Sequence, residues 1–110
     1  MTLTKSPTYL FDRVKQLLPH NRVITERALK TAHELGFDGE DIDQILCQEL
    51  KPEHFFKTMP AEKKPGLWQD VYKLQYLGVP LYLKLQLSAS TTQVVVVISL
   101  TEDESASLNR

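Results

Sequence analysis

A strictly alternating segment, residues 81–87, reads LYLKLQL. Leucine occupies every odd position, and Tyr82, Lys84 and Gln86 stand between the leucines. Because successive side chains of a strand point to opposite faces, this pattern predicts a β-strand with one buried face. Burying the leucines stabilises the fold by about 6 to 12 kcal/mol, whereas a slip of one residue would bury the polar set instead. We therefore expect Tyr82, Lys84 and Gln86 to lie on the outer face of a sheet.

Further extended segments surround this strand. Residues 67–77 precede it, with Gly78 as the turn, which predicts an antiparallel hairpin with residues 79–87. Residues 93–100 contain the run VVVVI, which is typical of a central strand covered on both faces. A shorter apolar-rich piece, residues 55–59, precedes the polar loop PAEKKPG. The second half of the chain is therefore predicted to be a meander of strands.

The first half shows the apolar spacing of amphipathic helices. Three helices are predicted, over residues 10–18, 26–35 and 40–50, with a brief extended piece at Val23 and Ile24. Thr25 and Asp38 are suitable N-cap residues for the second and third helices, and Gly36 is a stop signal. Helices followed by a meander are typical of the α+β class, so we expect N-terminal helices packed on one face of a C-terminal antiparallel sheet.

Composition bounds the architecture. With 110 residues, of which 42% are hydrophobic and 25% charged, residues 1–110 are expected to form a single domain with flexible tails at 1–7 and 104–110. No apolar run reaches the roughly 18 residues of a membrane span, and the start lacks the features of a secretory signal, so a cytoplasmic protein without membrane contact is expected. The single cysteine, Cys47, cannot form an internal disulfide and is interpreted as a packing residue.

The net charge of −1 hides an uneven distribution. Residues 1–36 carry six basic and three acidic side chains, and residues 52–87 carry five lysines against three acids. Residues 37–50 carry five acids and no base, and the tail from residue 101 carries three acids and Arg110. We expect the basic segments to face a polyanion, and the acidic helix and tail to face elsewhere.

Familiar cofactor motifs are absent from the sequence. It contains no glycine-rich phosphate loop, no HExxH, no CxxC and no acidic pair at metal-binding spacing among the strands, so no metal and no cofactor are expected. The strand half instead supplies a polar set of lysines, a glutamine and a tyrosine: Lys57, Gln69, Lys73, Tyr82 and Lys84. These residue types suit metal-free cleavage of RNA by its own 2′-hydroxyl group.

Each residue type in this set has a chemical use. Lysines stabilise the negative charge that builds on the attacked phosphate. A nearby lysine also favours the ionised form of a tyrosine, which makes Tyr82 a candidate for proton transfer. Gln69 can bind a phosphate or a base edge, and Trp68 can stack on a base, although tryptophan in a strand is more often a packing residue. Taken alone, polar residues on an outer strand face are more often solvated scaffold than a site.

Three short segments carry a family resemblance: FFKTM, LWQDVYK and LYLKL. They are similar to the F-[FY]-K-[ST]-M, WQDVY and VYLK series of the MqsR family of type II toxin–antitoxin ribonucleases. The segment RALKTAHELGFD also resembles the family's helix, and the resemblance extends over residues 9–101. It implies a RelE-like toxin fold and a metal-independent mRNA interferase that cleaves messenger RNA and so inhibits translation.

The resemblance also implies roles for single residues. The family's catalytic lysine, glutamine and tyrosine match Lys57, Gln69 and Tyr82. RNA contacts are expected from the remaining lysines of the polar set, Lys73 and Lys84, and from Trp68. It implies a cognate antitoxin, generally a zinc-containing, DNA-binding protein. For its docking surface, the acidic helix over residues 40–49 and an exposed sheet edge both stay open.

One position departs from the family pattern. The family places a further lysine just after the last strand, where this chain has Thr101, followed by two acids. Lys73 or Lys84 could supply the missing charge. The alternative is a catalytically impaired protein of the same fold that binds RNA or an antitoxin.

Overall fold

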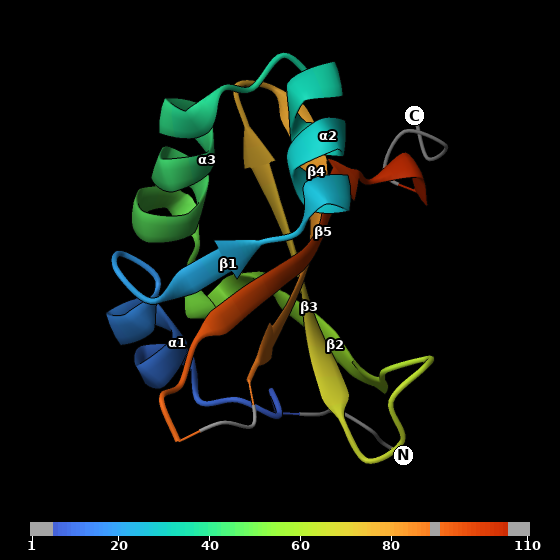
Figure 1. The fold of residues 1–110 in the computed structure, drawn as a ribbon. Helices are drawn as coiled ribbons and strands as arrows, with labels where there is room; N and C mark the ends of the chain where they lie inside the picture. Colours follow the sequence, from blue (N-terminus) through green and yellow to red (C-terminus); the bar gives the residue numbers. More distant parts are fainter. Residues whose placement is uncertain (1–5, 89–90, 106–110) are drawn as a thin grey trace.

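Five strands form a single sheet in the order β1-β5-β4-β3-β2 in the computed structural model, which describes residues 6–88 and 91–105 (Figure 1). The strands are β1 (Arg22–Ile24), β2 (Phe55–Pro60), β3 (Trp68–Tyr76), β4 (Val79–Leu87) and β5 (Val95–Glu102). The helices are α1 (Phe11–Leu17), α2 (Glu26–Glu34) and α3 (Gly39–Gln44), followed by the π-helical turn η1 (Ile45–Glu49) and the 3-10 turn η2 (Pro52–His54). None of the described helices is long and apolar enough to cross a membrane.

The predicted α+β class is confirmed, with the strands of the second half joined antiparallel. The sheet is mixed, however, because β1 pairs parallel with β5, from Arg22 opposite Val95 to Ile24 opposite Val97. The strand predicted over 93–100 lies two residues later than expected, so that Thr101 belongs to β5. Its apolar run is buried at Val95 and Val97 but only half-buried in between, so β5 is covered fully on one face.

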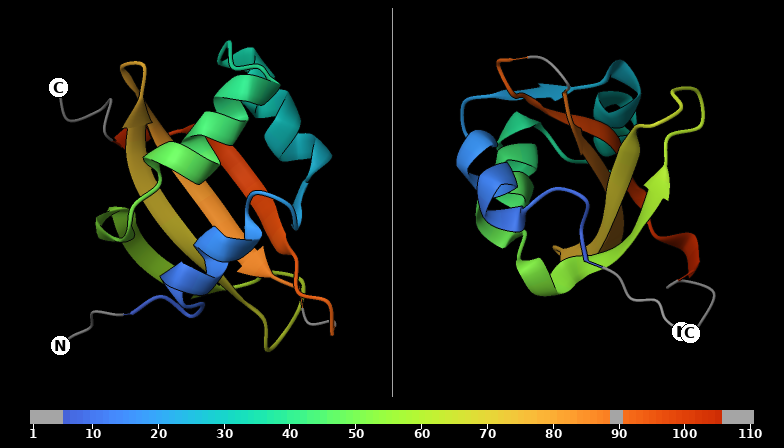
Figure 2. Two further views of the ribbon diagram at one scale, coloured as in Figure 1. Left: turned by 90° about the vertical axis from the view of Figure 1, so that its left-hand side faces the viewer. Right: turned by 90° about the horizontal axis from the view of Figure 1, so that it is seen from below.

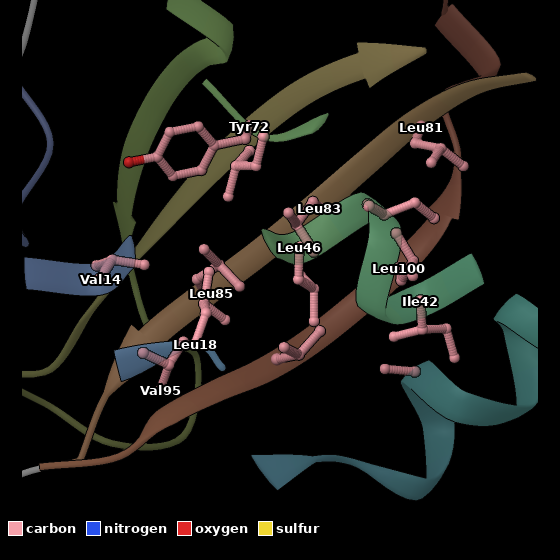
Figure 3. Close-up of a cluster of buried hydrophobic side chains, with 14 of the residues drawn as sticks. Val14, Leu18, Ile42, Leu46, Tyr72, Leu81, Leu83, Leu85, Val95 and Leu100 are labelled. Carbon is pink, nitrogen blue, oxygen red and sulfur yellow. The ribbon is translucent and has the colours of Figure 1, made fainter. Parts of the chain in front are cut away.

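The alternating segment has the predicted orientation. Leu81, Leu83, Leu85 and Leu87 of β4 are buried, and the polar residues between them are half-buried on the opposite face. The leucines pack under α1 and α3. Val14 of α1, Leu18 just after it, Ile42 of α3 and Leu46 of η1 complete the core (Figure 3). Figure 2 shows α1 and α3 lying over one face of the sheet, with α2 beside β5. The other face of the strands is therefore left for polar side chains.

Helix α2 covers the edge of β5 beyond the short strand β1. The predicted N-cap, Thr25, accepts a hydrogen bond from Ala28 N, and its hydroxyl also donates to the carbonyl of Ile98. Further along α2, the hydroxyl of Thr31 donates to the carbonyl of Leu100 at 2.7 Å. The two threonines thus satisfy strand carbonyls that β1 is too short to reach, which protects this edge.

The third helix changes its winding in its second half. Residues 40–50 were predicted as one helix, but after Gln44 the chain continues as the π-helical turn η1. Lys15 of α1 donates from Nζ to the carbonyls of Cys47 at 2.9 Å and Leu50 at 3.1 Å, at the end of this turn. Burial lowers the pKa of Lys15, which nevertheless serves as a cap from a neighbouring helix. Burial also raises the pKa of Cys47, which agrees with a packing role for this thiol.

The WQDVY segment fixes the start of the described chain to the sheet. Asp70 is buried, and its carboxylate accepts hydrogen bonds from the backbone N–H groups of Thr8 at 3.0 Å and Tyr9 at 2.9 Å. The hydroxyl of Tyr9 donates to the carbonyl of Trp68 at 2.6 Å. Two residues after Asp70, the hydroxyl of Tyr72 is buried and has no hydrogen-bond partner in the described part of the chain. Burial and the nearby Asp70 carboxylate raise the pKa of Tyr72.

Tyr72→Phe is expected to leave the free energy of unfolding unchanged or to raise it by up to about 1 kcal/mol, because it removes a buried hydroxyl without a partner. Urea denaturation measures the change. Tyr76→Phe is the matched control on the same strand: it removes a hydroxyl that donates to Asp41 at 2.8 Å, so it should lower stability. A Tyr72→Phe variant less stable than Tyr76→Phe would contradict the expectation.

Candidate active site

The face of the sheet opposite α1 and α3 carries the predicted polar set. Lys57 on β2 and Lys84 on β4 are both paired with Val71 on β3, so these three residues form a row across the sheet. Val71 is fully buried even though it belongs to this outer face. The stems of lysine side chains cover apolar neighbours while their ammonium groups stay in water. Val71 therefore gives Lys57 and Lys84 an apolar support on either side of it.

A second row lies two residues further along the strands, on the same face of the sheet. Lys73 on β3 is paired with Tyr82 on β4, and Tyr82 is paired with Thr101 on β5. Thr101 was predicted just after the last strand, but because β5 continues to Glu102 it lies directly beside Tyr82. The position at which the family pattern has a lysine is thus next to the tyrosine. Here it presents a hydroxyl and a methyl group.

Lys73 is held by several partners. Its Nζ lies 3.9 Å from the centroid of the Phe56 ring, 3.3 Å from Oδ2 of Asp103 and 3.3 Å from Oγ of Ser105. Lys57 Nζ lies 5.6 Å from the same ring. A β-bulge between Phe55 and Lys57 lets the two phenylalanines of FFK take different roles, with Phe55 packed on Tyr72 and the Phe56 ring about half exposed beside the lysines.

The Asp103 carboxylate anchors the chain just after β5. Burial disfavours its charge, but hydrogen bonds from Ser105 and Lys73 outweigh this cost and hold the pKa of Asp103 below its usual value. Flexible tails were predicted at 1–7 and 104–110; residues 1–5 and 106–110 lie outside the described part, and Ser105 is bound to Asp103 at 2.8 Å.

Gln69 completes the set through a partner that the sequence did not single out. Its Nε2 donates to Oε1 of Gln86 on β4 at 3.0 Å. The alternation of residues 81–87 predicts only an outward, solvated position for Gln86. Their hydrogen bond fixes the orientation of the Gln69 amide, and each amide retains further donor or acceptor capacity.

Two adjoining hollows mark this face. The first, called here the tyrosine hollow, has a volume of about 810 Å³ and is lined by Tyr82, Lys57, Lys73 and Phe56. The second, called here the basic groove, has a volume of about 890 Å³ and is lined by Gln69, Lys84 and Gln86 among others. Thr101 lines both. Of the predicted catalytic residues, Lys57 and Tyr82 line the tyrosine hollow and Gln69 lines the adjoining basic groove.

Two expectations about this surface change. The tail acids were expected to face away from the basic segments, yet Glu102, Asp103 and Glu104 line the tyrosine hollow, because β5 and the turn after it run beside Tyr82. Trp68 does not lie on the same face of the sheet as the polar set. It alternates with Gln69 along β3, on the same side as Asp70, and it lines neither hollow.

Asp103→Asn is expected to lower the melting temperature at neutral pH, because the lowered pKa means that ionised Asp103 stabilises the folded state. That contribution is present above about pH 4, the usual value for aspartate, and is lost as the pH falls through the lower folded value. Melting curves from about pH 3 to pH 7 should thus show the two proteins converging in acid. A gap that stays constant or widens in acid would refute this assignment.

Comparisons with known proteins show which family the chain belongs to. Residues 6–102 match the family described as motility quorum-sensing regulator, toxin of MqsA. The chain is also 32% identical over 82 residues to the mRNA interferase toxin MqsR of Escherichia coli (strain K12), which covers 74% of this chain and 83% of that protein. The matched region contains every strand of the sheet and both hollows up to Glu102. The chain belongs to the MqsR toxin family.

Proposed function

We propose that this protein is the toxin of a type II toxin–antitoxin pair and acts in the cytoplasm as an endoribonuclease that cleaves messenger RNA and so inhibits translation. The observation that carries this proposal is the juxtaposition of Tyr82 with Lys73 in one strand pair and with Lys57 in the same hollow. The name of the Escherichia coli relative, an mRNA interferase, supports the same reaction.

The proposed reaction is attack of a ribose 2′-hydroxyl on the adjacent phosphate. The bond from O2′ to phosphorus forms, the bond from phosphorus to O5′ breaks, and the products are a cyclic phosphate and a free 5′-hydroxyl. One proton must leave O2′ and one must reach O5′. Tyr82 is the proposed proton-transfer group, because it lines the same hollow as Lys57 and Lys73.

The remaining residues act on the phosphate. Lys57 stabilises the developing negative charge, which is often the largest catalytic contribution. Gln69, oriented by Gln86, is the proposed hydrogen-bond donor to the phosphate or to a base. Lys84 is better suited than Lys73 to replace the family's missing lysine. Lys73 is paired with Asp103, whereas Lys84 forms no ion pair with any residue in ranges 6–88 and 91–105.

Purified protein is expected to cleave single-stranded RNA in the presence of EDTA, because every proposed step uses side chains of the chain itself. Tyr82→Phe should slow cleavage by about 10² to 10⁴-fold and Lys57→Met by about 10² to 10³-fold. Methionine keeps the apolar stem beside Val71 and removes only the charge. Gel analysis of labelled RNA measures the rates.

Tyr72→Phe is the matched control for Tyr82→Phe, since it removes a tyrosine hydroxyl from the core side of the neighbouring strand. It should cleave at the wild-type rate. Equal losses in the two variants would mean that the effect of Tyr82→Phe is not specific to the site.

The substitute for the missing lysine can be tested in the same assay. Lys84→Met is expected to slow cleavage more than Lys73→Met, because the Lys73 charge is already neutralised in part by Asp103. If neither variant changes the rate, neither lysine replaces the family's charge at position 101.

A second candidate function has its own supporting observation. Thr101 is paired with Tyr82, and four acidic side chains line the tyrosine hollow and weaken its positive potential. A catalytically impaired relative that binds RNA or an antitoxin would show this arrangement. RNA that stays intact on prolonged incubation with folded protein would favour this second function.

The partner follows from the family, whose description makes these proteins toxins of MqsA. We propose that the antitoxin of this chain is a zinc-containing, DNA-binding protein encoded beside it. A small adjacent gene with zinc-ligand cysteines and a helix-turn-helix pattern would support this, and a neighbour without either would contradict it.

A further inference from the structure

The basic groove gathers cations from three separate parts of the fold. Arg27 comes from α2, Lys63 and Lys64 come from the loop between β2 and β3, and Lys84 comes from β4. Only one carboxylate, that of Glu62, lines the same groove among the described residues. Four cations against one anion make the groove a surface for a polyanion.

The loop that carries the two lysines has a defined conformation. The sequence Lys64-Pro65-Gly66-Leu67 forms a turn in which Leu67 N donates to the carbonyl of Lys64 at 3.1 Å and Gly66 has φ of +84°. Proline followed by a glycine with positive φ is the combination that a type II turn requires. A bond of 2.8 Å from Ala61 N to the carbonyl of Leu67 closes the loop at its base. Lys63 and Lys64 are thus carried at the rim of the groove by a closed loop.

The tyrosine hollow has the opposite charge balance. Its two lysines, Lys57 and Lys73, face four carboxylates, those of Glu34, Glu102, Asp103 and Glu104. A strand of RNA that passes the boundary near Thr101 is therefore attracted on the side of the basic groove and repelled on the other side. The RNA on one side of the cleaved phosphate is therefore attracted more strongly than the RNA on the other side.

The floor of the groove suits nucleobases as well as phosphates. Val96 and Ile98 of β5 are half-buried there, and they offer apolar surface between the charged walls. The bonded amides of Gln69 and Gln86 stand beside them with hydrogen-bonding capacity left for a base edge. A positively charged groove that follows the phosphate backbone is one feature of proteins that bind single strands. Here apolar and amide side chains, rather than aromatic rings, would contact the bases.

We propose that the basic groove binds single-stranded RNA on one side of the cleaved phosphate, with Lys63, Lys64 and Arg27 contacting its phosphates. The tyrosine hollow adds little binding on the other side. This inference rests on the proposed ribonuclease function and adds to it where the flanking strand lies.

The first test measures binding without cleavage. The probe is a single-stranded oligoribonucleotide of mixed sequence with 2′-O-methyl groups throughout, so that no 2′-hydroxyl can attack. Each phosphate contact contributes about 0.7 to the slope of log affinity against log salt concentration. The variant Lys63→Ala/Lys64→Ala should therefore have a slope about 1.4 shallower than wild type. Lys30→Ala/Lys51→Ala, which removes two exposed lysines that line neither hollow, should keep the wild-type slope.

A slope unchanged in Lys63→Ala/Lys64→Ala, or reduced equally in both double variants, would overturn the proposal. Unchanged RNA binding combined with weaker binding of the antitoxin would also overturn it, and would assign the groove to the protein partner. Wild-type protein that binds the probe with the expected lysine dependence but cleaves no RNA would refute the ribonuclease function. The same result would support the basic groove as a binding site for single-stranded RNA.

The second test asks whether the basic groove binds RNA on only one side of the cleaved phosphate. Once a cleavage position is mapped in a long RNA, two short substrates are made, one extended only 5′ and one only 3′ of that position. Lys63→Ala/Lys64→Ala should raise KM severalfold for one of them and leave the other unchanged. Equal effects on both substrates, or no effect on either while wild type cleaves both, would refute one-sided binding.

Discussion

The structure depends on the register of β4. Its alternating leucines pack under α1 and α3, and a shift by one residue would exchange every leucine for a polar side chain. The same constraint that builds the core therefore presents Tyr82 and Lys84 on the opposite face. Neighbouring strands follow, because pairing with β4 places Lys73 beside Tyr82 and Val71 beside Lys84. The alternation of leucines and polar residues in β4 thus determines both the packing of the core and the geometry of the candidate site.

The WQDVY segment places residues with different roles on the two faces of the sheet. Gln69 points to the outer face and bonds to Gln86, while Asp70 is buried and holds the backbone of Thr8 and Tyr9. Five consecutive residues that resemble one functional motif thus contain a candidate site residue and a structural anchor. The alternation of a strand separates these two residues, whereas a β-bulge separates the two phenylalanines of FFK.

Much of this could be predicted from the sequence because it follows from short-range patterns. The bounds of β4, the cap at Thr25 and the outward position of Tyr82 depend only on residues close in the chain. The contacts that sequence reasoning missed join distant segments. Pairing of Tyr82 with Thr101 required the true end of β5, and the approach of Asp103 to Lys73 required the path of the chain after it. The extended piece predicted at Val23 and Ile24 is present as β1, but three residues give no signal for its parallel pairing with β5.

Val71 links the chemistry of this face to the folding of the whole sheet. It is buried on an outer face, with a lysine opposite it on each side. Selection for a stable sheet would therefore retain long aliphatic side chains at positions 57 and 84 even in a descendant that no longer cleaves RNA. In such a lineage, methionine, glutamine or arginine would be tolerated there sooner than glycine or aspartate. The loss of activity would then leave little trace in the shape of the surface.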